Sequence, residues 1–183
     1  SPQSPEEMSE KIKAIEGQTV RILAPIVKSK KGLHKALFER AIESEILEVR
    51  VDGVFAKPTR FEEGLEKNKA HTVEYVVGRY NPARITTDLI KEAVLQALSL
   101  SAGTVIAHAE GTDMILSMDR TCPLCGTGFF KPDPEDLSFN SRRGVCEQCA
   151  GTGQDSKGQP CAECLGTRLA ALGRNLRLAG HHI

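Results

Sequence analysis

Cys122-Pro-Leu-Cys125, Cys146-Glu-Gln-Cys149 and Cys161-Ala-Glu-Cys164 contain all six cysteines of this 183-residue chain. The second and third pairs continue into the pattern Cys-x-x-Cys-x-Gly, with Gly151 and Gly166 at the last position. Two residues between cysteines let one tight turn present both sulfur atoms to one metal ion. A glycine just after the second cysteine permits backbone conformations that strain other residues. This duplicated pattern predicts a small cysteine-rich subdomain held by structural Zn2+.

Three cysteine pairs leave the choice of ligands open, because a structural zinc takes four ligands. In one arrangement the second and third pairs share an ion across an 11-residue spacer. In the other, the first and second pairs share it across a 20-residue spacer. The first arrangement is favoured because its two halves have the same pattern. Cys122 and Cys125 then take other ligands or remain free thiols.

Two other roles for the cysteines fit the pattern less well. Redox Cys-x-x-Cys motifs usually occur singly at a helix start near a βαβ unit, and that context is missing here. A catalytic zinc needs an open coordination position, which four cysteines do not leave.

Upstream of residue 119, helical and strand-like patterns alternate. Ser4 caps an apolar stripe of Met8, Ile12 and Ile15, and Asp52-Gly53 is a strong hairpin turn. Helices are also expected within residues 33–42 and 87–103, and strands at 19–27, 46–51, 54–55, 71–80, 104–108 and 114–117. The mixture predicts an α+β fold, with helices on a largely antiparallel sheet, over residues 1–118. Residues 119–183 are expected to form the zinc-binding segment.

Composition narrows the function classes. Hydrophobic residues make up 40% and aromatic residues 4%, so the core is expected to be aliphatic. The net charge of zero gives no global attraction to nucleic acid, and no apolar run reaches membrane-spanning length. The polar start does not suit a signal peptide, and the missing initiator methionine indicates an excised piece of a longer protein. We therefore expect a cytoplasmic chain with reduced thiols.

Several basic residues are candidates for contacts. Arg50 and Arg79 are expected on or at the ends of neighbouring strands, where an arginine is often simply exposed. The segment from Lys28 to Lys35 suits either a solvated basic turn or a phosphate contact. His108, in an apolar strand, is expected to be a packed histidine rather than a ligand.

Taken together, ordered segments along nearly the whole chain resemble the UvrA family, the damage-sensing ATPases of the bacterial ABC excinuclease, which act in nucleotide excision repair. The matching segments before the cysteines are Ser4-Pro-Glu-Glu-Met8, Ile22-Leu-Ala-Pro-Ile26, Lys31-Gly-Leu-His34-Lys35, Val49-Arg-Val-Asp-Gly53, Glu66-Lys-Asn-Lys-Ala-His-Thr72 and Val76-Val-Gly-Arg79. Those in the cysteine region are Cys122-Pro-Leu-Cys125-Gly126, Leu137-Ser-Phe-Asn-Ser141, Gly144-Val-Cys146 and Pro160-Cys-Ala-Glu-Cys-Leu-Gly-Thr-Arg-Leu169. Chaperones of the DnaJ type resemble only the cysteine turns.

The resemblance implies different roles for the two parts of the chain. Residues 1–118 resemble the domain that binds UvrB, and the partner-contacting arginines of that family fall on Arg50 and Arg79. Residues 119–183 resemble part of the first signature domain, with its zinc-binding turns. The resemblance also implies a full-length homodimer that meets DNA, a role in DNA repair and the SOS response, and a cytoplasmic location.

The chain departs from the family pattern in three places. A long insertion domain, implicated in DNA contact, usually separates the second and third cysteine pairs, whereas only residues 150–160 lie there in this chain. The family often has a basic residue at Glu48 and an acidic residue at Gly78. No Gly-x-x-x-x-Gly-Lys-Ser/Thr phosphate loop occurs, so no catalysis is expected from these residues.

Three functional hypotheses follow. The leading one is a protein-interaction module with a zinc-stabilised base. The second is a DNA-binding zinc module, which would contact phosphates through Lys28, Lys30, Lys31, Lys35, Lys131, Arg142 and Arg143. The third, a thiol enzyme, has no nucleophile, base and orienting group close together in the sequence.

Overall fold

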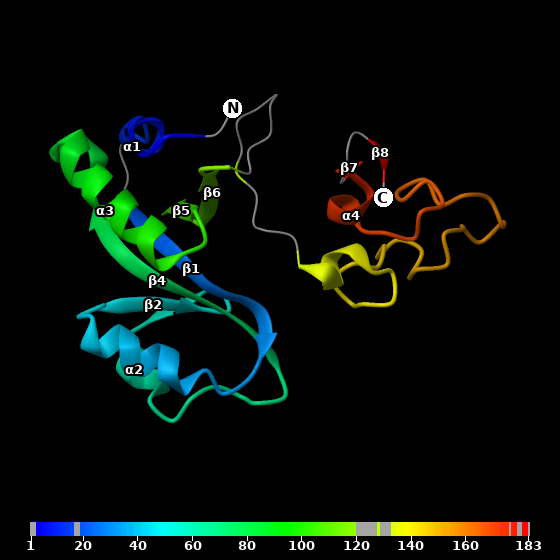
Figure 1. Ribbon diagram of the computed structural model, residues 1–183, viewed down its shortest axis with the longest axis horizontal. Helices are drawn as coiled ribbons and strands as arrows, with labels where there is room; N and C mark the ends of the chain where they lie inside the picture. The colour runs from blue at the N-terminus through cyan, green and yellow to red at the C-terminus, as the bar shows by residue number, and fades with distance from the viewer. Residues whose placement is uncertain are drawn as a thin grey trace. The chain divides into compact units, whose positions relative to one another are not determined.

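The computed structural model describes residues 3–16, 19–119, 128, 133–175, 177–178 and 181–182 (Figure 1). The chain divides into two compact units, Ser1–Phe130 and Lys131–Ile183, called units 1 and 2 below. This division falls further along the chain than the boundary predicted between residues 118 and 119, which stays a prediction.

Unit 1 is built on one six-stranded antiparallel sheet. The strands are β1 (Val20–Lys31), β2 (Glu48–Val51), β3 (Val54–Ala56), β4 (Ala70–Tyr80), β5 (Thr104–Ala109) and β6 (Thr112–Ser117), in the order β3-β2-β4-β1-β5-β6. Asp52 and Gly53 turn the chain from β2 into β3 with φ angles of 50° and 84°. Positive φ at both central residues is what a two-residue hairpin of this type requires. The predicted α+β fold is confirmed.

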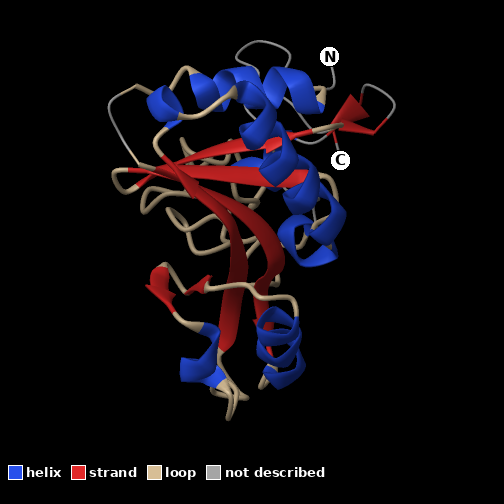
Figure 2. Ribbon diagram, turned by 90° about the vertical axis from the view of Figure 1, so that its left-hand side faces the viewer, coloured by secondary structure: helices blue, strands red, loops and turns tan. Residues whose placement is uncertain are grey.

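Three helices accompany the sheet (Figure 2), namely α1 (Pro5–Lys13), α2 (Lys35–Glu43) and α3 (Thr87–Leu100), with short 3-10 turns η1 (Pro58–Phe61) and η2 (Pro82–Arg84). Helix α1 begins with the predicted capping box, in which Ser4 and Glu7 each accept a hydrogen bond from the other's amide. Helix α3 is capped by Thr86, whose hydroxyl accepts a hydrogen bond from the Leu89 amide.

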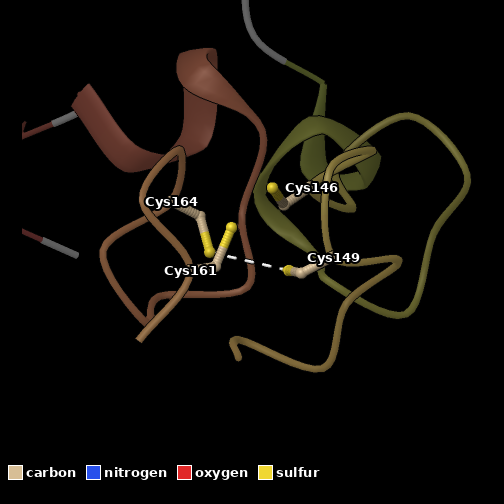
Figure 3. Close-up of side chains that lie close together, drawn as sticks. All are labelled: Cys146, Cys149, Cys161 and Cys164. Carbon is tan, nitrogen blue, oxygen red and sulfur yellow. Dashed lines mark hydrogen bonds between the residues drawn. The ribbon is translucent and has the colours of Figure 1, made fainter. Parts of the chain in front are cut away.

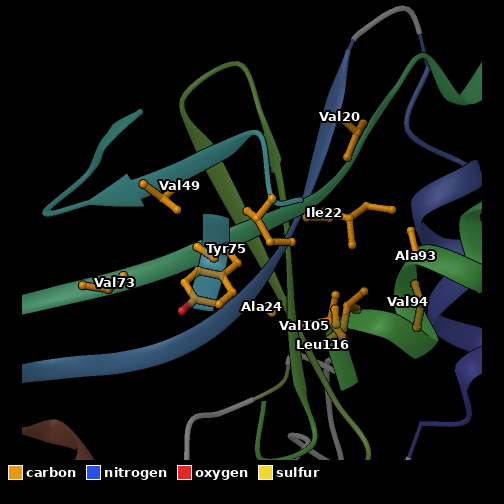
Figure 4. Packing of buried hydrophobic residues seen from close by; sticks show 14 of the residues in the cluster. Val20, Ile22, Ala24, Val49, Val73, Tyr75, Ala93, Val94, Val105 and Leu116 are labelled. Carbon is orange, nitrogen blue, oxygen red and sulfur yellow. The ribbon is translucent and has the colours of Figure 1, made fainter. Parts of the chain in front are cut away.

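The core of unit 1 lies between the helices and one face of the sheet (Figure 4). Alternate residues of β1, β2, β4, β5 and β6 point into this core, which is the period-two pattern of a strand with one buried face. Its fully buried side chains are almost all aliphatic, as predicted. Members labelled in Figure 4 are Val20, Ile22, Ala24, Val49, Val73, Tyr75, Ala93, Val94, Val105 and Leu116.

The basic segment after Val27 is a strand rather than the predicted turn. Strand β1 continues to Lys31, and Lys30 and Lys31 pair with His71 and Ala70 of β4. The long β4 provides a partner for this end of β1, and such pairing outweighs the weak strand propensity of lysine. Ser29, with a φ of 50°, lies where the register of the two strands shifts.

Unit 2 consists mostly of turns. It contains η3 (Pro134–Leu137), α4 (Ala171–Asn175) and the short hairpin β7 (Arg177–Leu178) and β8 (His181–His182). Isolated bridges join Val145 to Leu169 and Gln154 to Pro160. Across the described ranges of both units, every helix is too short or too polar to cross a membrane.

Candidate functional site

Four cysteines of unit 2 form one compact cluster (Figure 3). The sulfur atoms of Cys146, Cys149, Cys161 and Cys164 all lie within 4.8 Å of one another, and those of Cys149 and Cys164 are 3.7 Å apart. Four sulfur atoms around one zinc would be about 3.8 Å apart when each Zn–S bond is about 2.3 Å. The cluster therefore has the dimensions of a tetrahedral site with four cysteine ligands.

The surroundings of the cysteines shift the pKa values of Cys149 and Cys146 in opposite directions. Desolvation opposes the charged form, but the amide N–H groups of Gly153 and Gly151 and neighbouring thiols outweigh it and lower the pKa of Cys149 to about 6. The Gly153 amide donates to the Cys149 sulfur over 3.3 Å, and its φ of 78° is one that glycine adopts without strain. At Cys146 the Cys149 amide lowers the pKa, but burial and nearby thiols outweigh it and raise the pKa to about 11.

These residues fit a structural metal ion. The structure brings together the second and third cysteine pairs, three of whose four side chains are buried. Four such ligands would complete the coordination of zinc and leave no position for a substrate. Cys122 and Cys125 lie outside the described residues, so their part in metal binding stays a prediction.

A second cluster of charged residues lies in unit 1, on the face of the sheet opposite the main core. The Arg50 guanidinium donates to Glu74 from both Nε and Nη2, the latter over 2.7 Å. It also donates two 2.8 Å hydrogen bonds to Asp113. His108 Nδ1 lies 2.6 Å from Asp113 and its ring stacks near Phe55. His108 is thus packed among polar and aromatic groups.

This cluster shows that the sheet is strongly curled. Strand β2, which carries Arg50, is four strand spacings from β6, which carries Asp113. A flat sheet would separate these strands by about 19 Å, further than an arginine side chain can reach. The second face is therefore concave, and it encloses a small apolar cluster of Leu23, Val76 and Ile106.

Arg50 stays positively charged although it is buried. Its side chain is 8% exposed, and that of Glu74 is 6% exposed. Desolvation disfavours the cation, but the carboxylates of Glu74 and Asp113 outweigh that penalty and hold the pKa of Arg50 above its usual range. All the carboxylate partners of this guanidinium come from within unit 1.

Arg79 has a different environment. It lies near the end of β4, beyond the residues of β4 that pair with β2, and its side chain is exposed. Among the described residues its guanidinium has no ion-pair or hydrogen-bond partner. The structure thus confirms that Arg50 and Arg79 occupy neighbouring strands but does not bring them together.

The predicted phosphate contacts are mostly accessible. Lys28, Lys30, Lys31 and Lys35 of unit 1 are exposed, as is Arg142 of unit 2. Arg143 instead contacts Asp136 over 2.8 Å, with Asp133 and Glu135 close by. Lys131 lies outside the described residues.

Sequence reasoning missed Arg21 and Phe55. Arg21 donates to Glu48 over 2.8 Å, and its guanidinium lies 4.3 Å from the centre of the Phe55 ring. The alternation of Val20, Arg21 and Ile22 places Arg21 on the face away from the core, but only the folded sheet reveals its neighbours.

Unit 1 thus carries a charged concave sheet face, and unit 2 carries four cysteines that could hold a metal ion. Residues 3–111 match the sequence model of the UvrA interaction domain, and the chain belongs to this family. The chain is 35% identical over 154 residues to UvrABC system protein A of Lactiplantibacillus plantarum and 36% identical over 155 residues to that of Lactococcus lactis. Identity to the Staphylococcus aureus protein is 32% over 158 residues. These matches cover 82–84% of this chain but only 16% of each relative.

Proposed function

We propose that this chain is the part of a UvrA protein that recruits UvrB during nucleotide excision repair. The observation that carries this proposal is the family match over residues 3–111, which covers nearly all the described part of unit 1. Unit 1 would supply the docking surface, and unit 2 would be stabilised by zinc. The activity is binding, with no reaction catalysed by these residues themselves.

The two candidate arginines would have different roles in docking. Arg79 is exposed and its donors are available, so its planar guanidinium can pair with a partner carboxylate through two parallel hydrogen bonds. The donors of Arg50 are committed to Glu74 and Asp113. Arg50 would act by holding β2, β4 and β6 in the curled arrangement that the partner recognises.

The test measures binding of the full chain to purified UvrB of the same organism by calorimetry. We expect Arg79→Ala to weaken binding about tenfold or more, as for an interface anchor, without lowering the melting temperature. Arg50→Ala should weaken binding and also lower the melting temperature, because it leaves Glu74 buried and unpaired.

Two outcomes would contradict this assignment. Wild-type chain that fails to bind UvrB would refute the recruiting function itself. Wild-type affinity in both alanine variants would leave the function intact but remove the two arginines from it.

A structural zinc at Cys146, Cys149, Cys161 and Cys164 is the second part of the proposal. When bound, the ion would join the two turns covalently at four points and so replace a hydrophobic core. Zinc analysis of the purified chain, combined with anomalous scattering at the metal edge, would count the ions and identify their ligands. A folded, metal-free chain would contradict it.

DNA binding is the alternative, supported by the exposure of Lys28, Lys30, Lys31 and Lys35 around the end of β1 and the start of α2. If these lysines neutralise phosphates, affinity for duplex DNA should fall steeply as salt rises, because condensed counterions are released on binding. A flat salt dependence, or no binding at low salt, would exclude this role.

A further inference from the structure

Two arginines are paired at one end of the two central strands of the unit 1 sheet. Arg21 of β1 and Arg79 of β4 are direct partners in the antiparallel register. Side chains of direct partners lie on the same face, with Cβ atoms about 5 Å apart. Like charges in this arrangement destabilise a sheet. The pair therefore costs stability in the isolated chain, and it calls for an explanation.

An irregularity in β4 produces this arrangement. Ile22 pairs with Gly78, but the next residue, Leu23, pairs with Val76, so Val77 is an extra residue in β4. Such a β-bulge re-aims the side chains that follow it. In a regular strand, Arg79 and Val76 would lie on opposite faces because they are three positions apart. The bulge places Arg79 on the concave face beside Arg21.

Only one of the two positive charges is balanced within the chain. The Arg21 guanidinium is held by Glu48 and by the Phe55 ring, which fixes its position. Arg79 has no partner among the residues that the structure describes. An arginine held in place by Glu48 thus lies beside an exposed arginine that has no carboxylate partner among the described residues. This is the charge pattern of an incomplete site for an anion.

We propose that Arg21 and Arg79 together bind one carboxylate side chain of the docking partner. This inference rests on the proposed recruitment of UvrB and adds Arg21 to the docking surface. A carboxylate that enters between the guanidinium groups removes their repulsion and accepts charge-assisted hydrogen bonds from both. Binding of the partner thereby removes a repulsion that destabilises the free chain.

The surroundings favour a protein carboxylate over the phosphates of DNA. Glu48 beside Arg21 is 25% exposed, and Asp113, in the strand after His108, is 35% exposed. A DNA backbone presents a continuous row of negative charges, which these carboxylates would repel. A single acidic side chain brings only one negative charge close to Glu48, whereas a DNA backbone would bring several.

The decisive variant is Arg79→Glu, tested for UvrB binding and thermal unfolding of the full chain. The new carboxylate would pair with Arg21 across the strands, so we expect the melting temperature to rise by about 2 °C. The same variant should bind UvrB about 100-fold more weakly, because a like charge now faces the partner carboxylate. Greater stability with lost binding cannot result from misfolding.

Arg60→Glu is the matched control, since Arg60 is an exposed arginine on η1 in the same unit. We expect it to change UvrB affinity less than about threefold, as for a residue outside the interface. Arg21→Gln and Arg79→Gln should each weaken binding about tenfold. Their combined loss should be smaller than the product of the two, because both side chains hold the same group.

The outcomes separate this inference from the function on which it rests. If the wild-type chain does not bind UvrB, the recruiting function fails. If the wild type binds and Arg79→Glu binds as tightly as the Arg60→Glu control, the shared carboxylate site fails while recruitment stands. Multiplicative losses in the double variant would assign the arginines to separate contacts and overturn the shared site. Loss of duplex DNA binding with unchanged UvrB affinity would overturn it in favour of a phosphate.

Discussion

The two units of this chain are held together by different means. Unit 1 encloses an extensive aliphatic core between helices and sheet. In unit 2, the buried apolar side chains of the described residues are Cys146, Cys161, Cys164 and Leu169. We therefore expect hydrophobic burial to be sufficient for unit 1, and unit 2 to depend on a metal ion bound by its four sulfur atoms. This difference explains why unit 1 can carry unfavourable charge on its surface.

The free energy gained by burying the core of unit 1 can offset the cost of unfavourable charges on its sheet. A buried ion pair such as Arg50–Glu74 is often no more stable than well-packed apolar residues, and a like-charge pair such as Arg21–Arg79 is worse. A sheet with a continuous core can sustain these costs at a binding face. The described residues of unit 2 form no comparable apolar core.

Metal removal gives the largest expected effect and tests the comparison directly. A strong chelator, added to the full chain near pH 7.5, should unfold unit 2 and leave unit 1 folded. Structural zinc contributes on the order of 10 kcal/mol of folding free energy in small modules. Amide hydrogen exchange should lose protection at Cys146, Cys161 and Leu169 and keep it in β1 and β4.

The matched variants are Cys161→Ser, which removes a ligand, and Ser156→Ala, which alters the exposed spacer nearby. Only the cysteine variant should reproduce the effect of the chelator. Retained protection in unit 2 after complete metal removal would show that the two units do not differ in this way.

Replacement of Arg50 gives the next largest effect, because the carboxylate of Glu74 would then be buried without a partner and out of reach of water. Arg50→Met should lower the free energy of unfolding by about 3–5 kcal/mol by leaving Glu74 uncompensated. Arg79→Met, in an exposed position, should change the same quantity by less than about 0.5 kcal/mol. Urea unfolding followed by far-UV circular dichroism measures both.

The double variant Arg50→Met with Glu74→Met should recover most of the loss, since it removes both buried charges and leaves the more exposed Asp113 solvated. If the double variant is less stable than Arg50→Met, the buried pair contributes through its shape and not through its charge.

The sequence predicted what depends on local chemistry. The capping box at Ser4, the turn at Asp52-Gly53 and the Cys-x-x-Cys turns each follow from residues within a few positions of one another. The α+β class followed from the period of the apolar residues, which reports directly on burial. The proximity of the second and third cysteine pairs followed from their shared pattern.

Long-range pairing was beyond prediction from one sequence. The exposed-arginine expectation could not foresee that Arg50 is buried, because its partner Asp113 lies 63 residues away and meets it only after the sheet curls. The strand through Lys31 depends on the length of β4, and the side on which Arg79 lies depends on a bulge at Val77. Each of these is set by the partner strand and not by local propensity.

A smaller effect is expected from pH through Asp113. Partial burial raises the pKa of this carboxyl, but hydrogen bonds from Arg50 and His108 outweigh it and hold the pKa below its usual value of 3.8. A lowered pKa means that the group stabilises the fold above pH 3.8, and this contribution is lost as the pH falls through the lower pKa of the folded state. Asp113→Asn should cost about 1 kcal/mol at pH 7, since solvent screens a partly exposed group.

That cost should shrink as the pH falls below 3.8, because the wild-type carboxyl is protonated as the pH passes through the lower pKa of the folded state. Urea midpoints of wild type and Asp113→Asn, followed through the amide signals of β5, would give the difference at each pH. A difference that stays constant from pH 7 to pH 3 would show that Asp113 acts through packing.

The smallest effect is expected in the spacer between the two cysteine turns. Gln154 and Pro160 form an antiparallel bridge, and Asp155 Oδ1 accepts hydrogen bonds from the amides of Lys157 and Gln159. The tip of this turn is fully exposed, and its two ends already lie side by side. Extending the turn therefore leaves the geometry of the sulfur atoms unchanged.

Replacing residues 155–159 with 15 glycine and serine residues should cost about 1 kcal/mol of loop-closure entropy. Zinc affinity should fall less than about tenfold, as competition with a chromogenic chelator would show. An equally long insertion between Val145 and Cys146 is the contrasting variant, because it separates Cys146 from the Arg168 carbonyl that accepts its amide hydrogen bond. If both insertions abolish metal binding, unit 2 depends on its full network of turns and not on the four sulfur atoms alone. The two units would then not differ in the way proposed.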